Sequence, residues 1–228
     1  AYQTMLPTSL KIDNEKYDYS IYNNYVVIKD EEACKYFVLN NKKAKKQVEF
    51  VNRLLTEKRI SKKEVSTQVL NSLLEKDLVT IEKENVYRIN PNVNKTEEKI
   101  LTDEQTKAME EVKNSFDIFN VFLLHGITGS GKTEVYIKLV SEVLKNGKTV
   151  IMLVPEITLT TQIVKRFYEC FGDNVAIFHS GLSDGEKADE YNKILRDEAK
   201  IVVGTRSSIF VPLQNIGLII IDEEHTSS

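Results

Sequence analysis

The sequence predicts an α/β protein in which a parallel-sheet lobe follows a small α+β module. Short apolar runs alternate with helical stretches beyond residue 100, as is typical of parallel strands joined by crossover helices. A glycine-rich loop, residues 126–133, stands between one of these runs and a helical stretch. A closely spaced set of helical segments and alternating runs fills residues 42–90 and predicts a separate domain.

The composition suits a globular protein of one large or two modest domains. The chain has 228 residues, of which 41% are hydrophobic, and its formal net charge is −3. Its apolar runs are far shorter than the roughly 20 residues that span a bilayer, so we expect no membrane partner. Cys34 and Cys170 lie far apart without CxxC spacing, which predicts neither a zinc site nor a disulfide framework. We therefore expect a cytoplasmic protein.

Residues 1–41 predict a connecting segment that is partly strand. A tyrosine-rich run, residues 17–28, alternates loosely and indicates a strand, or a hairpin with a turn near Asn23 and Asn24. These tyrosines could stack on nucleic-acid bases or pack inside the protein, and packing is the commoner case. The chain opens at Ala1 rather than at a methionine, which we interpret as an internal start.

Residues 42–90 predict a winged-helix domain. Apolar residues at helical spacing indicate helices on both sides of a capping-box pattern at residues 61–64, which predicts a further short helix. Residues 79–89 then predict a hairpin with its turn at residues 82–85. The last helix of such domains often contacts DNA. Here three polar side chains could do so: Thr67, Gln68 and Asn71. The alternative is a spacer or protein contact, because the hairpin tip is acidic.

Residues 91–100 are polar and interrupt every periodicity, so we expect an interdomain linker there. Residues 101–228 predict one nucleotide-binding lobe. Its expected strands are residues 121–125, 149–154, 175–178, 201–204 and 218–222, and its expected helices are residues 132–145, 158–171 and 184–196. The carboxyl ends of parallel strands converge on one edge of the sheet. We therefore expect the glycine-rich loop and the acidic residues after the last strand to meet at that edge.

The glycine-rich loop has the spacing of a phosphate-binding loop. Its glycines let the backbone fold round an anion, and amides at the following helix N-terminus point at the phosphates. We expect Lys132 to reach the β- and γ-phosphates of ATP, and Thr133 to offer its hydroxyl to Mg²⁺. The expected nucleotide contacts of the loop are Gly126, Thr128, Gly129, Ser130, Gly131, Lys132 and Thr133. A chance glycine-rich turn would not explain the acidic run after the last strand.

Acidic residues follow the last apolar run. Asp222 is the second expected ligand of Mg²⁺, because this hard cation prefers carboxylate, hydroxyl and phosphate oxygens. Glu223 is expected to orient or deprotonate the attacking water, so the candidate catalytic residues are Lys132, Asp222 and Glu223. Glu224 and His225 are expected to couple hydrolysis to movement, with a structural role as the alternative for His225.

Several stretches resemble the superfamily 2 helicases, and in particular the replication-restart helicases that assemble primosomes. They are residues 123–136 (LLHGITGSGKTEVY), 153–157 (LVPEI), 179–186 (HSGLSDGE), 204–207 (GTRS) and 221–225 (IDEEH). The resemblance is specific from residue 101 onward and looser over residues 42–90. It implies a RecA-like P-loop lobe that uses ATP and Mg²⁺. It also implies forked or single-stranded DNA, primosome proteins and single-strand-binding proteins as partners in the bacterial nucleoid.

By position, the resemblance implies that Gln105 reads the adenine edge of ATP. It also implies that two segments follow a single DNA strand through its phosphates, using hydroxyls, backbone amides and one guanidinium. The residues concerned are Pro155, Thr160, Gln162, Thr205 and Arg206. Family members often carry Gly-Leu-Thr-Pro-Gln where residues 158–162 read Thr-Leu-Thr-Thr-Gln, which changes the loop there. For Arg206, a surface ion pair is the alternative to DNA contact.

The resemblance also implies parts that we do not find in this sequence. These are a second lobe whose arginines complete the ATP site, a cysteine-rich zinc-binding segment, and an N-terminal domain that captures a DNA 3′ end. We therefore expect a fragment of a 3′-to-5′ DNA helicase that binds ATP and DNA weakly, with negligible hydrolysis and no unwinding. Zinc is expected only in the full-length proteins. Two alternatives stay open: another superfamily 2 translocase or RNA helicase, and a DNA-binding or loading scaffold that needs no hydrolysis.

Overall fold

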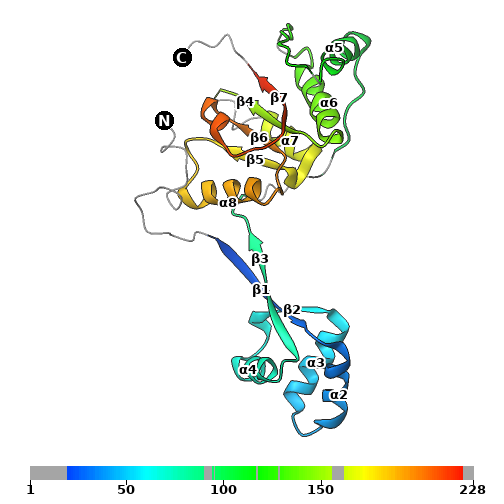
Figure 1. Ribbon diagram of the computed structural model, residues 1–228, viewed down its shortest axis with the longest axis vertical. Helices are drawn as coiled ribbons and strands as arrows, with labels where there is room; N and C mark the ends of the chain where they lie inside the picture. The colour runs from blue at the N-terminus through cyan, green and yellow to red at the C-terminus, as the bar shows by residue number, and fades with distance from the viewer. Residues whose placement is uncertain are drawn as a thin grey trace. The chain divides into compact units, whose positions relative to one another are not determined.

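A computed structural model describes residues 20–89, 94, 96–116, 118–127, 129–155 and 162–222 of the chain (Figure 1). The chain divides into two units. One is Ser20–Val86, and the described part of the other begins at Tyr87. Among the described residues, no helix combines the length and the apolar character needed to cross a bilayer.

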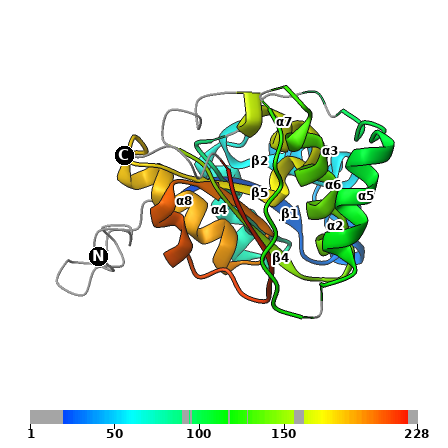
Figure 2. The same ribbon diagram turned by 90° about the horizontal axis from the view of Figure 1, so that it is seen from above.

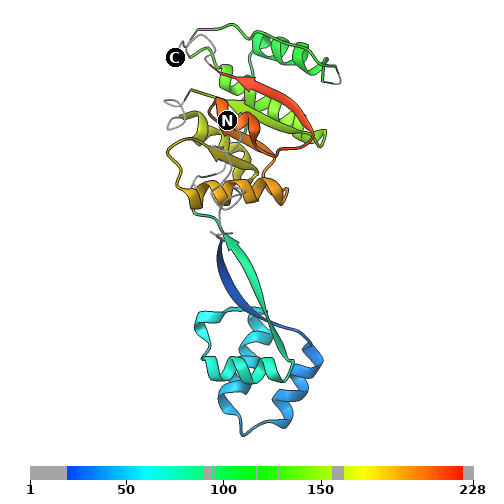
Figure 3. The ribbon, with the colours of Figure 1, turned by 60° about the vertical axis from the view of Figure 1, so that its left-hand side comes forward.

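The first unit is a three-stranded antiparallel sheet of order β2-β1-β3 with helices packed on it (Figure 3). Its elements are β1 (Ile21–Ile28), α2 (Glu31–Asn40), α3 (Lys45–Glu57), β2 (Arg59–Ser61), the 3₁₀ helix η2 (Lys62–Glu64), α4 (Thr67–Glu75) and β3 (Val79–Val86). Its core takes fully buried side chains from the sheet and from each α-helix, including Val26, Cys34, Leu54 and Leu73. One face of each helix is therefore buried, as the helical spacing predicts.

The prediction of a hairpin over residues 79–89 is wrong. β3 runs without a turn from Val79 to Val86 and pairs along its whole length with β1. Residues 82–85 keep extended backbone because each finds an antiparallel partner in β1, from Tyr22 to Tyr25. The hairpin prediction failed because residues 82–85 contain no glycine to favour a tight turn.

Residues 20–41 belong to this unit instead of forming a separate connecting segment. β1 is the central strand and continues straight through Asn23 and Asn24, so the turn proposed there is not formed. α2 begins after Asp30, whose carboxylate accepts hydrogen bonds from two amides of the first turn. The helix buries Cys34 in the core of the unit. The unit therefore starts earlier in the chain than the spacing of its helices predicts.

The second unit has a four-stranded parallel sheet of order β5-β6-β4-β7 between helices (Figures 1 and 2). Its elements are α5 (Asp103–Lys113), α6 (Lys132–Lys145), β4 (Thr149–Leu153), α7 (Gln162–Phe171), η4 (Gly172–Asn174), β5 (Val175–Phe178), α8 (Asp184–Leu195), β6 (Ile201–Gly204), η5 (Arg206–Phe210) and β7 (Ile216–Ile221). α6 and α7 pack on one face of the sheet and α8 on the other. The predicted α/β fold with a parallel sheet is confirmed.

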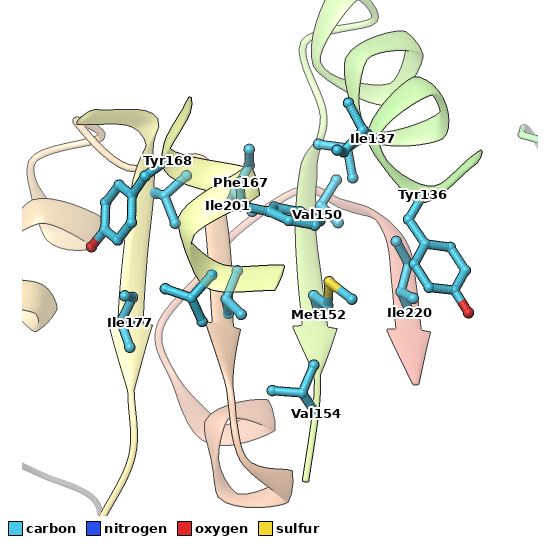
Figure 4. Packing of buried hydrophobic residues seen from close by; sticks show 14 of the residues in the cluster. Tyr136, Ile137, Val150, Met152, Val154, Phe167, Tyr168, Ile177, Ile201 and Ile220 are labelled. Atoms are coloured by element: carbon cyan, nitrogen blue, oxygen red, sulfur yellow. The ribbon is translucent and has the colours of Figure 1, made fainter. Parts of the chain in front are cut away.

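Alternate residues of β4 face opposite helical layers. Val150 and Met152 pack with α6 and α7, where Phe167 is fully buried (Figure 4). Ile151 packs on the other side with Ile194 of α8. Because both faces of the sheet are covered, β4 is a continuous apolar run instead of an alternating one.

The strand expected at residues 121–125 is not formed. These residues pair with no other strand of the described chain, and the side chains of Val121 and Leu123 are 79% and 83% exposed. β7 pairs with β4 along one edge, and no described strand pairs along its other edge. An extended run needs a neighbouring strand for its N–H and C=O groups. The apolar run instead lines the same cavity as Ile216–Ile221 of β7 and pairs with no described strand.

Both ends of the expected linker belong to the second unit. Upstream, Arg88 forms an ion pair at 2.8 Å with Asp189 of α8, whose side chain is almost completely buried. Downstream, the amide of Thr96 donates to the carbonyl oxygen of Glu169 in α7 at 3.0 Å. The boundary between the two units, at Val86 and Tyr87, therefore precedes the polar stretch, and described residues on both sides of that stretch belong to one unit.

Candidate functional site

The backbone of the glycine-rich loop requires glycine at two described positions. Gly129 and Gly131 both have a φ of 81°, in the left-handed region that other residues rarely adopt. Gly131 is also the N-cap of α6 and, because it has no side chain, it places no capping oxygen over the first amides of that helix. An anion can therefore approach the N-terminus of α6, as a phosphate-binding loop requires. Thr128 lies outside the described residues.

Lys132 is held by the loop that it follows. Its Nζ donates to the carbonyl oxygen of Gly126 at 2.6 Å and to that of Ile127 at 3.3 Å. These two neutral acceptors keep the ammonium group beside the loop. A phosphate oxygen would be a stronger acceptor than either carbonyl, because hydrogen bonds between charged groups are about twice as strong as neutral ones.

Gln105 contacts the loop from α5. Its Nε2 donates to the carbonyl oxygen of Ser130 at 2.9 Å, and its Oε1 accepts from the amide of Thr102 at 3.0 Å. Thr102 is the N-cap of α5 and completes a capping box with Gln105. The side chain of Gln105 is therefore fixed at the loop, and its role in reading adenine stays a prediction.

Alanine at position 131 is expected to weaken nucleotide binding. A Cβ there would lie 2.4 Å from Nε2 of Gln105, on a backbone that disfavours any side chain, so the loop and the glutamine must both move. We expect Gly131→Ala to lower the affinity for ADP by about tenfold, measured by titration calorimetry. Gly147→Ala is the matched control, since Gly147 has a φ of 69° but its Cβ would meet nothing within 4 Å. Equal losses of affinity in the two variants would contradict this expectation.

Asp222 follows β7 at the carboxyl edge of the sheet. Its amide donates to the carbonyl oxygen of Leu153 at 2.9 Å, which continues the parallel ladder between β7 and β4. Its Oδ1 accepts a hydrogen bond at 3.2 Å from the hydroxyl of Tyr136 on α6. Burial, together with the charge of Asp222, raises the pKa of Tyr136 above its ordinary value. No role was expected for Tyr136 from the sequence, although it lies one helical turn after Lys132.

A single cavity joins the phosphate loop to Asp222. The cavity has a volume of about 2440 Å³, and its lining includes Gly126, Gly131, Lys132, Thr133 and Asp222. The structure therefore brings together the two groups that the sequence places at this edge. The lining fits ATP and Mg²⁺ chemically, because it offers an ammonium group and a helix N-terminus for phosphates, and a hydroxyl and a carboxylate for a hard cation. Three further predicted residues lie outside the described part of the chain: Glu223, Glu224 and His225.

The lobe residues expected to contact DNA follow strands of the same sheet or begin the helix after one. Pro155 comes after β4 and Thr205 after β6, so both lie at the carboxyl edge of the sheet. Arg206 is exposed at the first position of η5, and Gln162 is exposed at the first position of α7. Thr160 lies outside the described residues. The described candidates therefore lie on segments that begin at this edge.

The residues of the first unit expected to contact DNA share the outer face of α4. Thr67, Gln68 and Asn71 are exposed, whereas Val69 and Leu73 of the same helix are buried in the core. This arrangement follows from the helical period, which separates polar and apolar positions onto two faces. The contact of this face with DNA stays a prediction.

The fold and the residues at the edge of the sheet define the class of protein, a parallel-sheet α/β lobe of the P-loop nucleotide-binding type. The chain belongs to the family described as type III restriction enzyme, res subunit, whose family model matches residues 98–228.

Its relatives include replication restart proteins. The chain is 51% identical to the replication restart protein PriA of Bacillus subtilis over 172 residues, which make up 73% of this chain and 21% of that protein. It is 46% identical to PriA of Synechocystis sp. over 165 residues, 72% of this chain and 20% of that protein. The chain therefore spans about a fifth of the length of these relatives. The resemblance to replication-restart helicases is confirmed.

A solved structure, the UvsW helicase from bacteriophage T4, is 16% identical to this chain. The match has a TM-score of 0.39 and covers 93% of this chain and 82% of that chain.

Proposed function

We propose that this chain is the first lobe, with the preceding small domain, of an ATP-dependent DNA helicase that restarts replication at stalled forks. The observation that carries the proposal is the cavity shared by Lys132, Thr133 and Asp222, in a chain that is 51% identical to a PriA protein. The whole protein would move 3′ to 5′ along forked DNA in the bacterial cytoplasm. Its partners would be primosome proteins and single-strand-binding proteins.

The residues at the cavity would have separate roles in the binding and hydrolysis of ATP. The first amides of α6 and the ammonium group of Lys132 would bind the phosphates, and Thr133 and Asp222 would hold Mg²⁺. The metal ion, when bound, neutralises charge that develops on the phosphates. Glu223 would orient the attacking water, and the residues after it would couple hydrolysis to movement.

This chain alone should bind nucleotide and show negligible hydrolysis. In related nucleotide hydrolases, an arginine from another domain or protein contributes roughly 10³–10⁵ to the rate. The chain covers only about a fifth of its relatives, so such a group is expected from the rest of the longer protein. Robust ATP turnover by the purified chain would refute this part of the proposal.

The DNA-contacting role of Arg206 has a measurable electrostatic consequence. If its exposed guanidinium contacts one phosphate of single-stranded DNA, Arg206→Ala should make the dependence on salt less steep. The magnitude of the negative slope of log affinity against log salt concentration should fall by about 0.7. The affinity itself should fall similarly for all DNA sequences, because a phosphate contact reads no base. Fluorescence anisotropy with labelled oligonucleotides at several salt concentrations measures both quantities.

Lys200→Ala is the control for this measurement. Lys200 directly precedes β6, so it lies at the opposite edge of the sheet from Arg206. The Lys200→Ala substitution should leave the slope of log affinity against log salt concentration unchanged. An unchanged slope for Arg206→Ala would mean that this residue does not contact the strand. Tighter binding of an RNA oligonucleotide than of DNA would favour the alternative of an RNA helicase.

A further inference from the structure

We infer that Tyr136 is a positioning residue for the predicted Mg²⁺ site, because its hydroxyl fixes the orientation of the Asp222 carboxylate. The inference rests on the proposed function, since Asp222 is a ligand only if the cavity binds Mg²⁺ with a nucleotide. Tyr136 is the last residue of the stretch 123–136, and the phosphate-loop motif within that stretch gives it no role. The hydrogen bond at 3.2 Å between its hydroxyl and Oδ1 of Asp222 is the starting observation.

The ring of Tyr136 is held in place by the core of the lobe. Its side chain belongs to the cluster between α6, α7 and the sheet, and the residue is only 7% exposed. Figure 4 shows the ring beside Ile220 of β7, with the hydroxyl directed toward the carboxyl end of that strand. A packed ring of this kind has few accessible rotamers, so its oxygen has a defined position. The hydrogen bond therefore connects a fixed donor to the acidic residue at the strand end.

The helix that carries Tyr136 also begins at the phosphate loop. Tyr136 follows Lys132 by one turn on α6, so the same rigid element places the loop lysine and the donor to Asp222. This arrangement sets the position of the carboxylate relative to the residues that would bind the phosphates. A shift of the carboxylate would alter both Mg²⁺ affinity and the alignment of the metal with the nucleotide.

Only one oxygen of Asp222 is used by Tyr136. A phenol is protonated at neutral pH, so Tyr136 donates and the carboxylate accepts. The hydrogen bond is to Oδ1, and a carboxylate has a second oxygen that can coordinate a cation. Partners that orient a metal-binding carboxylate in this way typically change metal affinity by about 10–100-fold when they are removed. The hydroxyl of Tyr136 should therefore matter for Mg²⁺ much more than for the nucleotide alone.

The lobe contains a matched control for the loss of a buried phenol hydroxyl. Tyr168 of α7 lies in the same apolar cluster and is 3% exposed. Its hydroxyl oxygen is buried and has no hydrogen-bond partner among the described residues. Tyr168→Phe therefore removes the same atom from the same core without removing a hydrogen bond to Asp222.

The test is a titration of Mg²⁺ into this chain in the presence of a fluorescent ADP analogue. We expect Tyr136→Phe to raise the Mg²⁺ concentration at half-saturation by about tenfold. Its affinity for the ADP analogue in EDTA should match that of the wild type. Tyr168→Phe should leave the Mg²⁺ midpoint unchanged. In an Asp222→Asn background, Tyr136→Phe should cause no comparable further shift, because its effect acts through the carboxylate.

Several outcomes would overturn the inference. One is an unchanged Mg²⁺ midpoint in Tyr136→Phe beside a clear Mg²⁺ dependence in the wild type, which leaves the proposed function standing. Another is an equal shift in Tyr168→Phe, or a lower melting temperature in Tyr136→Phe without a change in the midpoint, since either indicates general packing. If nucleotide binding by the wild type does not depend on Mg²⁺, the proposed site and the inference both fail.

Discussion

Lys132→Ala is expected to reduce the affinity of this chain for ATP by at least about 100-fold. The lysine ammonium group is held at the loop by the carbonyl oxygens of Gly126 and Ile127, where it can reach a phosphate at the N-terminus of α6. A hydrogen bond to a charged group contributes about 1.5–3 kcal/mol, and the lysine is expected to make such bonds to two phosphates. Equilibrium binding of a fluorescent ATP analogue measures the loss.

Lys145→Ala is the matched control for this prediction. Lys145 is the last residue of the same helix and pairs at the surface with Glu142 at 2.6 Å. Its substitution removes the same charge from α6 without touching the loop, so ATP affinity should stay within about twofold of the wild type. Similar losses in both variants would show that net charge, and not the loop contact, determines binding. Wild-type affinity in Lys132→Ala would refute the phosphate-loop assignment.

Lys193→Met is expected to destabilise the lobe by about 3–5 kcal/mol. The Lys193 ammonium group lies 2.6 Å from Oε1 of Glu190, and the side chains are 6% and 0% exposed. The other carboxylate oxygen of Glu190 accepts from the amide of Ile177 at 2.7 Å. Removing the lysine leaves a buried carboxylate without its countercharge, which is far more costly than losing a surface ion pair. Urea unfolding, followed by circular dichroism, measures the change.

The pH dependence of this variant provides an internal check. Burial raises the pKa of Glu190 above its ordinary value in the folded protein. The folded state therefore binds the proton more tightly than the unfolded state, and stability falls as the pH rises from the unfolded pKa through the folded one. Loss of Lys193 should strengthen this effect, so the destabilisation should be larger at pH 7 than near pH 4.5. A pH-independent loss would contradict the assignment to Glu190.

A double substitution separates the buried charge from packing. Glu190→Gln with Lys193→Met has no buried charge at this pair, and an amide oxygen can still accept from the amide of Ile177. We expect it to recover most of the stability lost in Lys193→Met. Lys187→Met, on the same helix, should change stability by less than about 0.5 kcal/mol. Failure of the double variant to recover would mean that the stem of Lys193 matters more than its charge.

The sheet of the lobe was predictable because its strands are buried on both faces. β4, β5 and β6 form short apolar runs at almost the positions that the sequence indicates, and helices cover both sides of them. The same reasoning failed at residues 121–125, which are equally apolar but form no strand. Apolar character predicts burial, whereas a strand also needs a neighbour for its hydrogen bonds. That neighbour cannot be read from the run itself.

The first unit was harder to predict because its sheet joins distant segments. β1 and β3 pair through residues about sixty positions apart, from Ile21 with Val86 to Ile28 with Val79. Local patterns favoured a turn inside each of these strands, since short polar stretches interrupt their apolar residues. Long-range pairing overrode those local preferences. The positions of α3 and α4 were more predictable than that of α2, because the apolar period of α3 and α4 marks their buried faces.

The candidate site was predictable where its chemistry is local. Gly129 and Gly131 have a positive φ, which glycine adopts readily, and Lys132 follows at the start of a helix. Tyr136 could not be assigned in this way, because its partner Asp222 lies 86 positions along the chain. A tyrosine at helical spacing is most often a core residue, and Tyr136 is one as well. Only the geometry connects its hydroxyl to the acidic residue.

ATP hydrolysis by the longer protein, with and without forked DNA, tests the central proposal most directly. We expect DNA to stimulate hydrolysis strongly, and we expect Lys132→Ala to abolish the stimulated rate while Lys145→Ala preserves it. Stimulation by DNA should also exceed stimulation by RNA. Hydrolysis that is indifferent to DNA, or that survives the substitution of Lys132, would contradict a DNA-driven motor and favour a scaffold that binds DNA without hydrolysis.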